Sequence, residues 1–283
     1  MAVFRFAPSP NGRLHLGHAF SALLNEKLAR GMGGRLLLRI EDIDRGRTRE
    51  EHVQAIVEDL AWLGFTYERP VRRQSAHMVE YAAAAARLRD QGLLYPCFCS
   101  RSEIARAASG LCDPDGAPLY PGTCRDLRRR DQDERLAGGR RPSFRLDMRR
   151  ACLDAPRLFW TRFDPAFRCD EIVARPERWG DPVVVRRDTP TSYHLAVVLD
   201  DAIQGVSHVV RGRDLEAATD LHRLLQALLE LPSPFYHHHT LVLDAAGEKL
   251  AKSTGSPALA DLRAAGETPA SVRARLGFES APL

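Results

Sequence analysis

The chain has 283 residues, of which 44% are hydrophobic, so it can bury one large core or two modest ones. Its net charge of +4 is too small to indicate nucleic-acid binding by itself. No apolar run reaches the roughly 18 residues of a membrane span, and the N-terminus lacks the apolar core of a secretory signal. We therefore expect a cytoplasmic protein with no membrane association.

The beginning of the chain predicts a βαβ unit. Residues 2–7 alternate like a short strand, a Pro/Gly-rich loop follows, and an apolar stripe predicts a helix from about Leu16 to Arg30. Residues 35–40 then read as a buried strand. Because a helix between two strands makes them parallel, the fold class is α/β with a Rossmann-type parallel sheet.

The rest of the chain divides into segments that differ in periodicity and composition. Helices are predicted near 50–63 and 78–91, and near Tyr95 the sequence becomes irregular and rich in Cys, Pro, Gly and Arg. Regular patterns resume with strands near 182–186, 206–211 and 240–243 and a helix near 214–229. We expect the first half of a Rossmann domain at 1–95, an inserted subdomain at 96–181, the second half at 182–239, and a loop with a short helical C-terminal segment at 240–283.

The first predicted helix begins with His15-Leu-Gly-His18. A helix N-terminus offers unpaired N–H groups and the positive end of a dipole, which suits phosphate. His15 and His18 are three residues apart, so both imidazoles can lie on one side of the first turn. Gly17 removes a side chain where a flat base could lie against the backbone. The alternative is a pair of histidines that simply caps a helix.

A second motif, Lys249-Leu-Ala-Lys252-Ser253, follows the last predicted strand. Besides Lys27, these two are the only lysines, because arginine supplies every other basic residue. A mobile lysine in such a loop could stabilise charge on the α-phosphate and on leaving pyrophosphate.

The two motifs together resemble the HIGH and KMSKS signatures of class I aminoacyl-tRNA synthetases. Ala251 departs from the usual serine, but the second lysine of the signature is present. The nucleotidyltransferases share the HxGH pattern and match less well. The resemblance implies that ATP is bound by His15, Gly17, His18, Lys249 and Lys252. It assigns catalysis to His15, His18 and Lys252, with Mg²⁺ accompanying ATP.

Four further segments resemble glutamyl-tRNA synthetases: residues 5–12, 38–44, 193–201 and 205–214. A substrate with two carboxylates and an ammonium needs arginines to bind the carboxylates and an acidic residue to bind the ammonium. The resemblance implies that L-glutamate is bound by Arg5, Ala7, Ser9, Glu41, Tyr193 and Arg211. The α-carboxylate of glutamate would attack the α-phosphate of ATP in line, giving glutamyl-adenylate and pyrophosphate.

Only residues 254–283 follow the second motif, too few for an anticodon-binding domain. This architecture resembles the glutamyl-Q tRNA(Asp) synthetases, stand-alone paralogues of the glutamyl-tRNA synthetase core. The resemblance implies a monomeric ligase that activates glutamate without tRNA and transfers it to queuosine in the anticodon of tRNA(Asp). The alternatives are a truncated glutamyl-tRNA synthetase core that charges a tRNA 3′ end, and an inactive zinc-bearing RNA-binding paralogue.

Four of the six cysteines, Cys97, Cys99, Cys112 and Cys124, have a spacing that suits a tetrahedral zinc site. The family pattern, C-x-C followed by Y-x-x-x-C, instead implies one structural Zn²⁺ held by Cys97, Cys99, Tyr120 and Cys124. Cys112 stays a competitor for the fourth position, and a site without metal is the other alternative. Cys152 and Cys169 are expected to be buried.

Two further features are ambiguous. Ten arginines between Arg125 and Arg150 could contact an RNA backbone or form a solvated face. The run His237-His-His239 is expected to point its rings to different faces, with one of them near the nucleotide.

Overall fold

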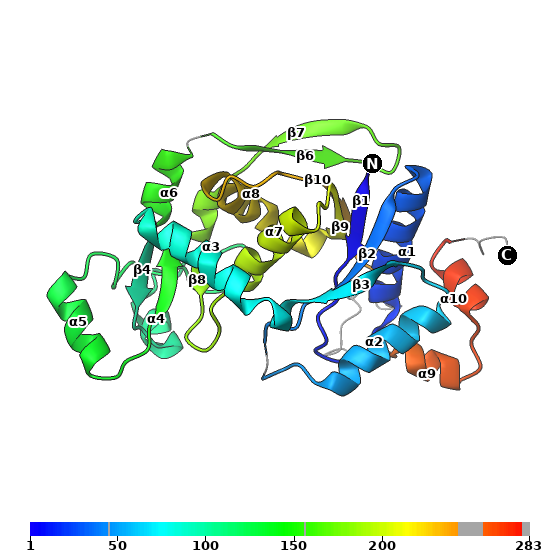
Figure 1. Ribbon diagram of the computed structural model, residues 1–283, viewed down its shortest axis with the longest axis horizontal. Helices are drawn as coiled ribbons and strands as arrows, with labels where there is room; N and C mark the ends of the chain where they lie inside the picture. The colour runs from blue at the N-terminus through cyan, green and yellow to red at the C-terminus, as the bar shows by residue number, and fades with distance from the viewer. Residues whose placement is uncertain (45, 156, 243–256, 279–283) are drawn as a thin grey trace.

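A computed structural model describes residues 1–44, 46–155, 157–242 and 257–278. Its centre is a seven-stranded sheet with strand order β3-β2-β1-β9-β10-β6-β7, parallel except for the final pair (Figure 1). These strands are β1 (Val3–Phe6), β2 (Arg35–Ile40), β3 (Glu68–Arg73), β6 (Phe159–Phe163), β7 (Cys169–Val173), β9 (His208–Gly212) and β10 (Phe235–His239).

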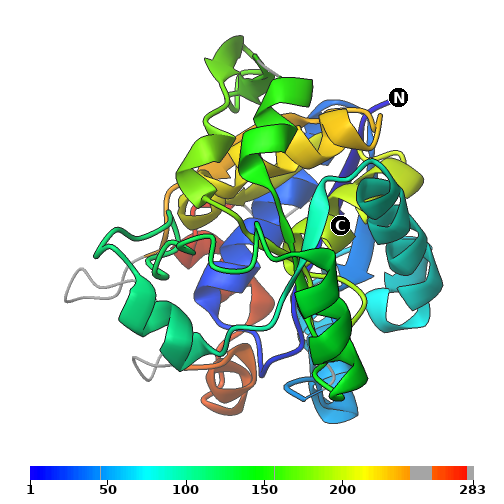
Figure 2. The same ribbon diagram turned by 90° about the vertical axis from the view of Figure 1, so that its left-hand side faces the viewer.

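A smaller antiparallel sheet, β4-β5-β8, lies at one end of the molecule with α4 and α5; Figure 2 views the molecule from this end. Its strands are β4 (Leu94–Cys97), β5 (Ser143–Leu146) and β8 (Val183–Val185). The helices are α1 (Leu16–Gly31), α2 (Glu50–Trp62), α3 (Met78–Asp90), α4 (Arg101–Ala107), α5 (Arg129–Ala137), α6 (Met148–Asp154), α7 (Tyr193–Ile203), α8 (Ala218–Leu228), α9 (Leu259–Ala264) and α10 (Pro269–Arg275). None of the helices described is long and apolar enough to cross a bilayer.

Alternate residues of the central strands face opposite sides of the sheet. Phe4, Leu36 and Val210 join the core that contains α1. Their neighbours Val3, Leu37 and Val209 belong to a separate cluster on the other face. On this second face Arg5 of β1 reaches Asp201 of α7, and Arg211 of β9 reaches Thr219 of α8. The sheet is therefore covered by helices on both sides, as parallel sheets usually are.

The strand order places a site between β1 and β9. The chain leaves β1 through α1 toward β2, and it leaves β9 through α8 toward β10, on the other side of the sheet. The two helices cover opposite faces, so the carboxyl ends of β1 and β9 form a topological switch point. Ligands of open α/β sheets bind at such points.

The predicted βαβ unit and α/β class are confirmed. The expected division at residues 96 and 181 does not follow the sheets, because β6 and β7 join the central sheet and β8 joins the small one. The strand predicted at 240–243 is wrong for its described residues, since the strand is Phe235–His239. Two short helices, α9 and α10, do end the described chain as predicted.

Candidate active site

A cavity of about 770 Å³ opens at the carboxyl ends of β1 and β9. It brings together every predicted ATP- and glutamate-binding residue that the structure describes. These are Arg5, Ala7, Ser9, His15, Gly17, His18, Glu41, Tyr193 and Arg211. Lys249 and Lys252 lie outside the described residues. The described residues on either side of that segment flank the cavity, because Leu241 and Val242 line it and Ala258 pairs with His15.

The two histidines of the first motif form the N-terminal cap of α1. Nδ1 of His15 accepts from the Gly17 N–H over 3.1 Å, and Nδ1 of His18 accepts from the His15 N–H over 3.2 Å. The ring centroids lie 3.9 Å apart. Because Nδ1 is an acceptor in both rings, each neutral imidazole carries its proton on Nε2. The cap thus fixes the tautomer that can donate to a phosphate.

Gly17 leaves room for the neighbouring His15 ring. A Cβ at this position would lie 3.0 Å from Cε1 of His15, closer than side chains normally approach. The glycine therefore lets the His15 ring fold back over the first turn of α1. This close approach is a reason for the glycine that the sequence did not reveal.

The other half of the cavity contains a buried charge network that the motifs only partly predicted. Nε of Arg5 donates to Oδ1 of Asp201 over 3.1 Å, and Arg39 donates to the same oxygen over 2.7 Å. Arg39 also donates to Glu41 over 3.2 Å. Although burial opposes it, the charges of Arg5 and Arg39 lower the pKa of Asp201. Burial raises the pKa of Glu41 despite its pairing with Arg39.

Arg211 differs from Arg5 in its partners. Its guanidinium donates to Thr219 Oγ1 over 2.8 Å and lies 3.2 Å from Nδ1 of His222 and 3.4 Å from Nε2 of His238. Within the described part of the chain, no carboxylate lies within 4.0 Å of it. An anion that enters the cavity can therefore pair directly with this buried guanidinium.

Asp201, Thr219, His222 and His238 were not predicted as site residues. Asp201 ends the segment 193–201 and His238 belongs to the histidine run, but neither pattern predicts a contact with an arginine, and Thr219 and His222 belong to no short motif. The histidine run does diverge as predicted: His237 Nδ1 meets the Phe163 carbonyl, while His239 lines the cavity. His238, for which the histidine run predicts no specific partner, contacts Arg211. Its only signal was alternation along β10, which turns it toward the face that Arg211 occupies.

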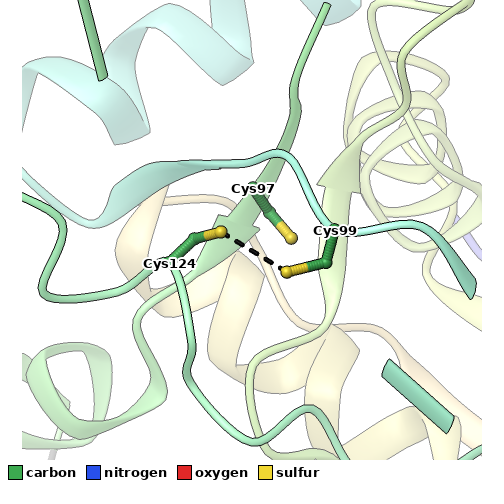
Figure 3. Close-up of side chains that lie close together, drawn as sticks. All are labelled: Cys97, Cys99 and Cys124. Atoms are coloured by element: carbon green, nitrogen blue, oxygen red, sulfur yellow. Dashed lines mark hydrogen bonds between the residues drawn. The ribbon is translucent and has the colours of Figure 1, made fainter. Parts of the chain in front are cut away.

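Three cysteines converge in the inserted region (Figure 3). The sulfur atoms of Cys97, Cys99 and Cys124 all lie within 4.8 Å of one another, and Cys99 and Cys124 are 3.5 Å apart. The Tyr120 hydroxyl lies 3.5 Å from the Cys99 sulfur and accepts from the Cys124 N–H over 2.9 Å. A hydrogen bond from Cys124 lowers the pKa of the Cys97 thiol, while burial and the neighbouring sulfurs raise the pKa of Tyr120.

The remaining cysteines stand apart from this cluster. Cys112 is exposed and pairs with Pro118 in a β-bridge. Cys152 is half-buried against the core of α7 and α8. Cys169 is exposed, so its predicted burial is wrong; it lies in β7 at the edge of the sheet, where one strand face is open to solvent.

Comparison with known proteins identifies the family to which this chain belongs. The profile of the family described as tRNA synthetases class I (E and Q), catalytic domain, matches residues 1–277. The chain belongs to this family and is a ligase. Relatives named glutamyl-Q tRNA(Asp) synthetase include one from Rhodobacter capsulatus, 47% identical over 98% of this chain and 100% of its own length. Another, from Nocardia farcinica, is 45% identical over 96% of this chain and 82% of its own length.

Longer relatives share the same core. A protein named glutamate–tRNA ligase 2 from Acidiphilium cryptum is 39% identical over all of this chain and 62% of its own length. The crystal structure of a glutamate-tRNA synthetase from Elizabethkingia anophelis matches with a TM-score of 0.71 and 26% identity, covering 90% of this chain and 53% of that one. This chain thus corresponds to about half to two thirds of those proteins.

Proposed function

We propose that this ligase uses ATP to activate L-glutamate and transfers it to queuosine in the anticodon of tRNA(Asp). The observation that carries the choice of amino acid is Arg211, a buried guanidinium that faces the cavity with neutral partners only among the described residues. The names of the relatives that align over nearly the whole chain support the acceptor. Since that acceptor is a tRNA in use for translation, the reaction belongs in the cytoplasm.

The cavity supplies both halves of the activation reaction. The His15 and His18 Nε2–H groups bind the phosphates of ATP at the N-terminus of α1. Arg5 and Arg211 hold the carboxylates of glutamate, Glu41 holds its ammonium group, and the Tyr193 hydroxyl adds a hydrogen bond. The α-carboxylate oxygen then bonds to the α-phosphorus as the bond to pyrophosphate breaks.

Positioning and charge stabilisation are sufficient for this reaction, so no protein nucleophile is needed. Lys249 and Lys252, together with Mg²⁺ bound to ATP, neutralise charge on the phosphates. Ala7 and Ser9 line the wall of the cavity beside β1, where backbone and hydroxyl groups can hydrogen-bond the substrate.

The cysteine cluster fits a structural zinc ion. Three thiols within 4.8 Å of one another offer the thiolates that zinc prefers. The position of the Tyr120 hydroxyl beside Cys99 and Cys124 favours it over the exposed Cys112 as fourth ligand. One Zn²⁺ held by Cys97, Cys99, Tyr120 and Cys124 would tie β4 to the loop before α5.

The acceptor is tested by transfer of labelled glutamate to purified tRNAs. We expect label on tRNA(Asp) that contains queuosine and none on unmodified tRNA(Asp) or on tRNA(Glu). Periodate oxidises both the queuosine diol and a 3′-terminal diol, so the unmodified tRNA(Asp) separates the two sites. Label on unmodified tRNA or on tRNA(Glu) would contradict the proposed acceptor.

Charging of a tRNA 3′ end is the second candidate. It is favoured by the relatives named glutamate–tRNA ligase 2, which are 37–39% identical to this chain over their shared core. The same transfer experiment distinguishes it, because a 3′-linked glutamate forms on tRNA(Glu) and does not require queuosine.

A further inference from the structure

Hydrogen-bonded histidine side chains contact Arg211 on the side away from the cavity. Nδ1 of His222 faces Nη1 of Arg211 over 3.2 Å, and the other ring nitrogen of His222 lies 3.1 Å from Nδ1 of His194. On the second side, Nε2 of His238 faces Arg211 over 3.4 Å and Thr219 Oγ1 over 2.9 Å. We call His222, His238 and Thr219 the arginine cage.

The hydrogen bonds fix the protonation of the cage. A guanidinium can only donate, so Nδ1 of His222 must accept, and its proton sits on Nε2. That proton is donated to Nδ1 of His194. Nε2 of His238 faces a guanidinium N–H, so it carries no proton and accepts the hydroxyl proton of Thr219, whose oxygen accepts from Arg211. Every member is therefore a neutral acceptor toward Arg211.

The electrostatics agree with this assignment. Burial and the charge of Arg211 lower the pKa of His222 well below its usual value, and they lower that of His238 to about 2. The buried Asp201 is shared by Arg5 and Arg39 on the other side of the cavity. Arg5 is thus paired with a carboxylate, whereas the hydrogen-bond partners of Arg211 in the described part of the chain are all neutral.

The cage also touches a second residue of the cavity. The ring of His222 lies 5.7 Å from the ring of Tyr193, centroid to centroid, and is only 1% exposed. His194, which follows Tyr193 on α7, packs against Trp179 at 5.1 Å. One imidazole on α8 therefore supports both a guanidinium from β9 and a tyrosine from α7.

We infer that His222, with His238 and Thr219, is a positioning residue that holds Arg211 through neutral acceptors and so reserves its charge for the carboxylate of the amino-acid substrate. The inference rests on the proposed function for the identity of that carboxylate. A carboxylate in place of His222 would neutralise Arg211 from inside the protein, and the cavity would lose its attraction for an anion.

The test compares two substitutions of equal size, His222→Asp and His222→Asn. Both lose the bond to His194, but the Asn amide oxygen still offers Arg211 a neutral acceptor. We expect Asn to weaken glutamate binding by at most about tenfold and Asp to weaken it by at least about 100-fold. The KM for ATP and the melting temperature should stay close between the two. Equal losses in both variants, or wild-type affinity in both, would overturn the inference.

A second measurement does not depend on activity. Nitrogen NMR of the histidine rings in the free protein should show His222 as a neutral ring protonated on Nε2 at pH 7. A ring protonated on Nδ1, or doubly protonated, would overturn the inference even if the enzyme is active. Wild-type protein that has this tautomer but binds no glutamate would instead contradict the proposed function.

Discussion

Asp201 on α7 accepts a 3.1 Å hydrogen bond from Arg5 on β1, and both side chains are almost fully buried. Arg39 shares the same carboxylate, so one acid fixes two strand-end arginines. The position of Arg5 in the cavity is thus set before any substrate enters.

This pairing predicts a large stability loss for Asp201→Asn. The variant removes the carboxylate that pairs with buried Arg5 and one of the carboxylates that pair with Arg39, and we expect the free energy of unfolding to fall by about 3 kcal/mol. Asp170→Asn is the matched control, because its partner Arg162 is 47% exposed and the pair is solvated. Urea unfolding of both variants measures the difference, and similar losses would contradict the role of Asp201.

Gly17→Ala should impair use of ATP. The added methyl group would lie 3.0 Å from the His15 ring and push it out of its capping position. We expect kcat/KM for ATP to fall by about 10- to 100-fold. Gly31→Ala at the other end of α1 places its methyl 3.9 Å from Phe167 and should change little. If both variants turn over ATP alike, the close approach at Gly17 has no bearing on the site.

Metal content tests the cysteine cluster. Cys124→Ser should abolish bound zinc, since the thiolate ligand is lost, while Cys112→Ser should retain one zinc per chain. Elemental analysis after dialysis measures both, and a chelator should lower the melting temperature of wild type only if zinc is present. Zinc loss in Cys112→Ser together with retention in Tyr120→Phe would make Cys112 the fourth ligand.

The buried histidines predict a loss of stability in acid. Burial and Arg211 lower the pKa of His194 from 6.5 to about 4. In that window the unfolded chain binds a proton that the folded chain does not, so stability falls as the pH drops from 6.5 toward 4. One pKa unit corresponds to about 1.4 kcal/mol, so protonation of His194 alone lowers the free energy of unfolding by about 3 kcal/mol across this pH range. Unfolding measured at pH 4.5 and 7 should show a smaller difference in His194→Gln; an unchanged difference would refute this assignment.

The early chain was predictable because its signals are local. The strand at 35–40 and the helix starting at Leu16 follow from apolar periodicity, and the His15–His18 cap from spacing within one turn. The cavity residues that belong to short sequence motifs were predictable, and nine of the predicted residues line the cavity.

What the sequence could not show depends on contacts between distant residues. Asp201 is 196 residues from Arg5, and no local pattern marks the pair. β6 and β7 lie in an irregular stretch. β6 enters the central sheet by pairing with β10, more than 70 residues later, and β7 joins by pairing with β6. Similarly, His238 gains its role only because β10 lies beside β9.

Activation of glutamate is tested most directly by ATP–pyrophosphate exchange with purified protein in the absence of any tRNA. We expect exchange that requires L-glutamate, is lost when aspartate replaces glutamate, and is abolished by Lys252→Ala. No exchange with glutamate under any condition, or exchange of equal rate with an uncharged amino acid, would contradict it.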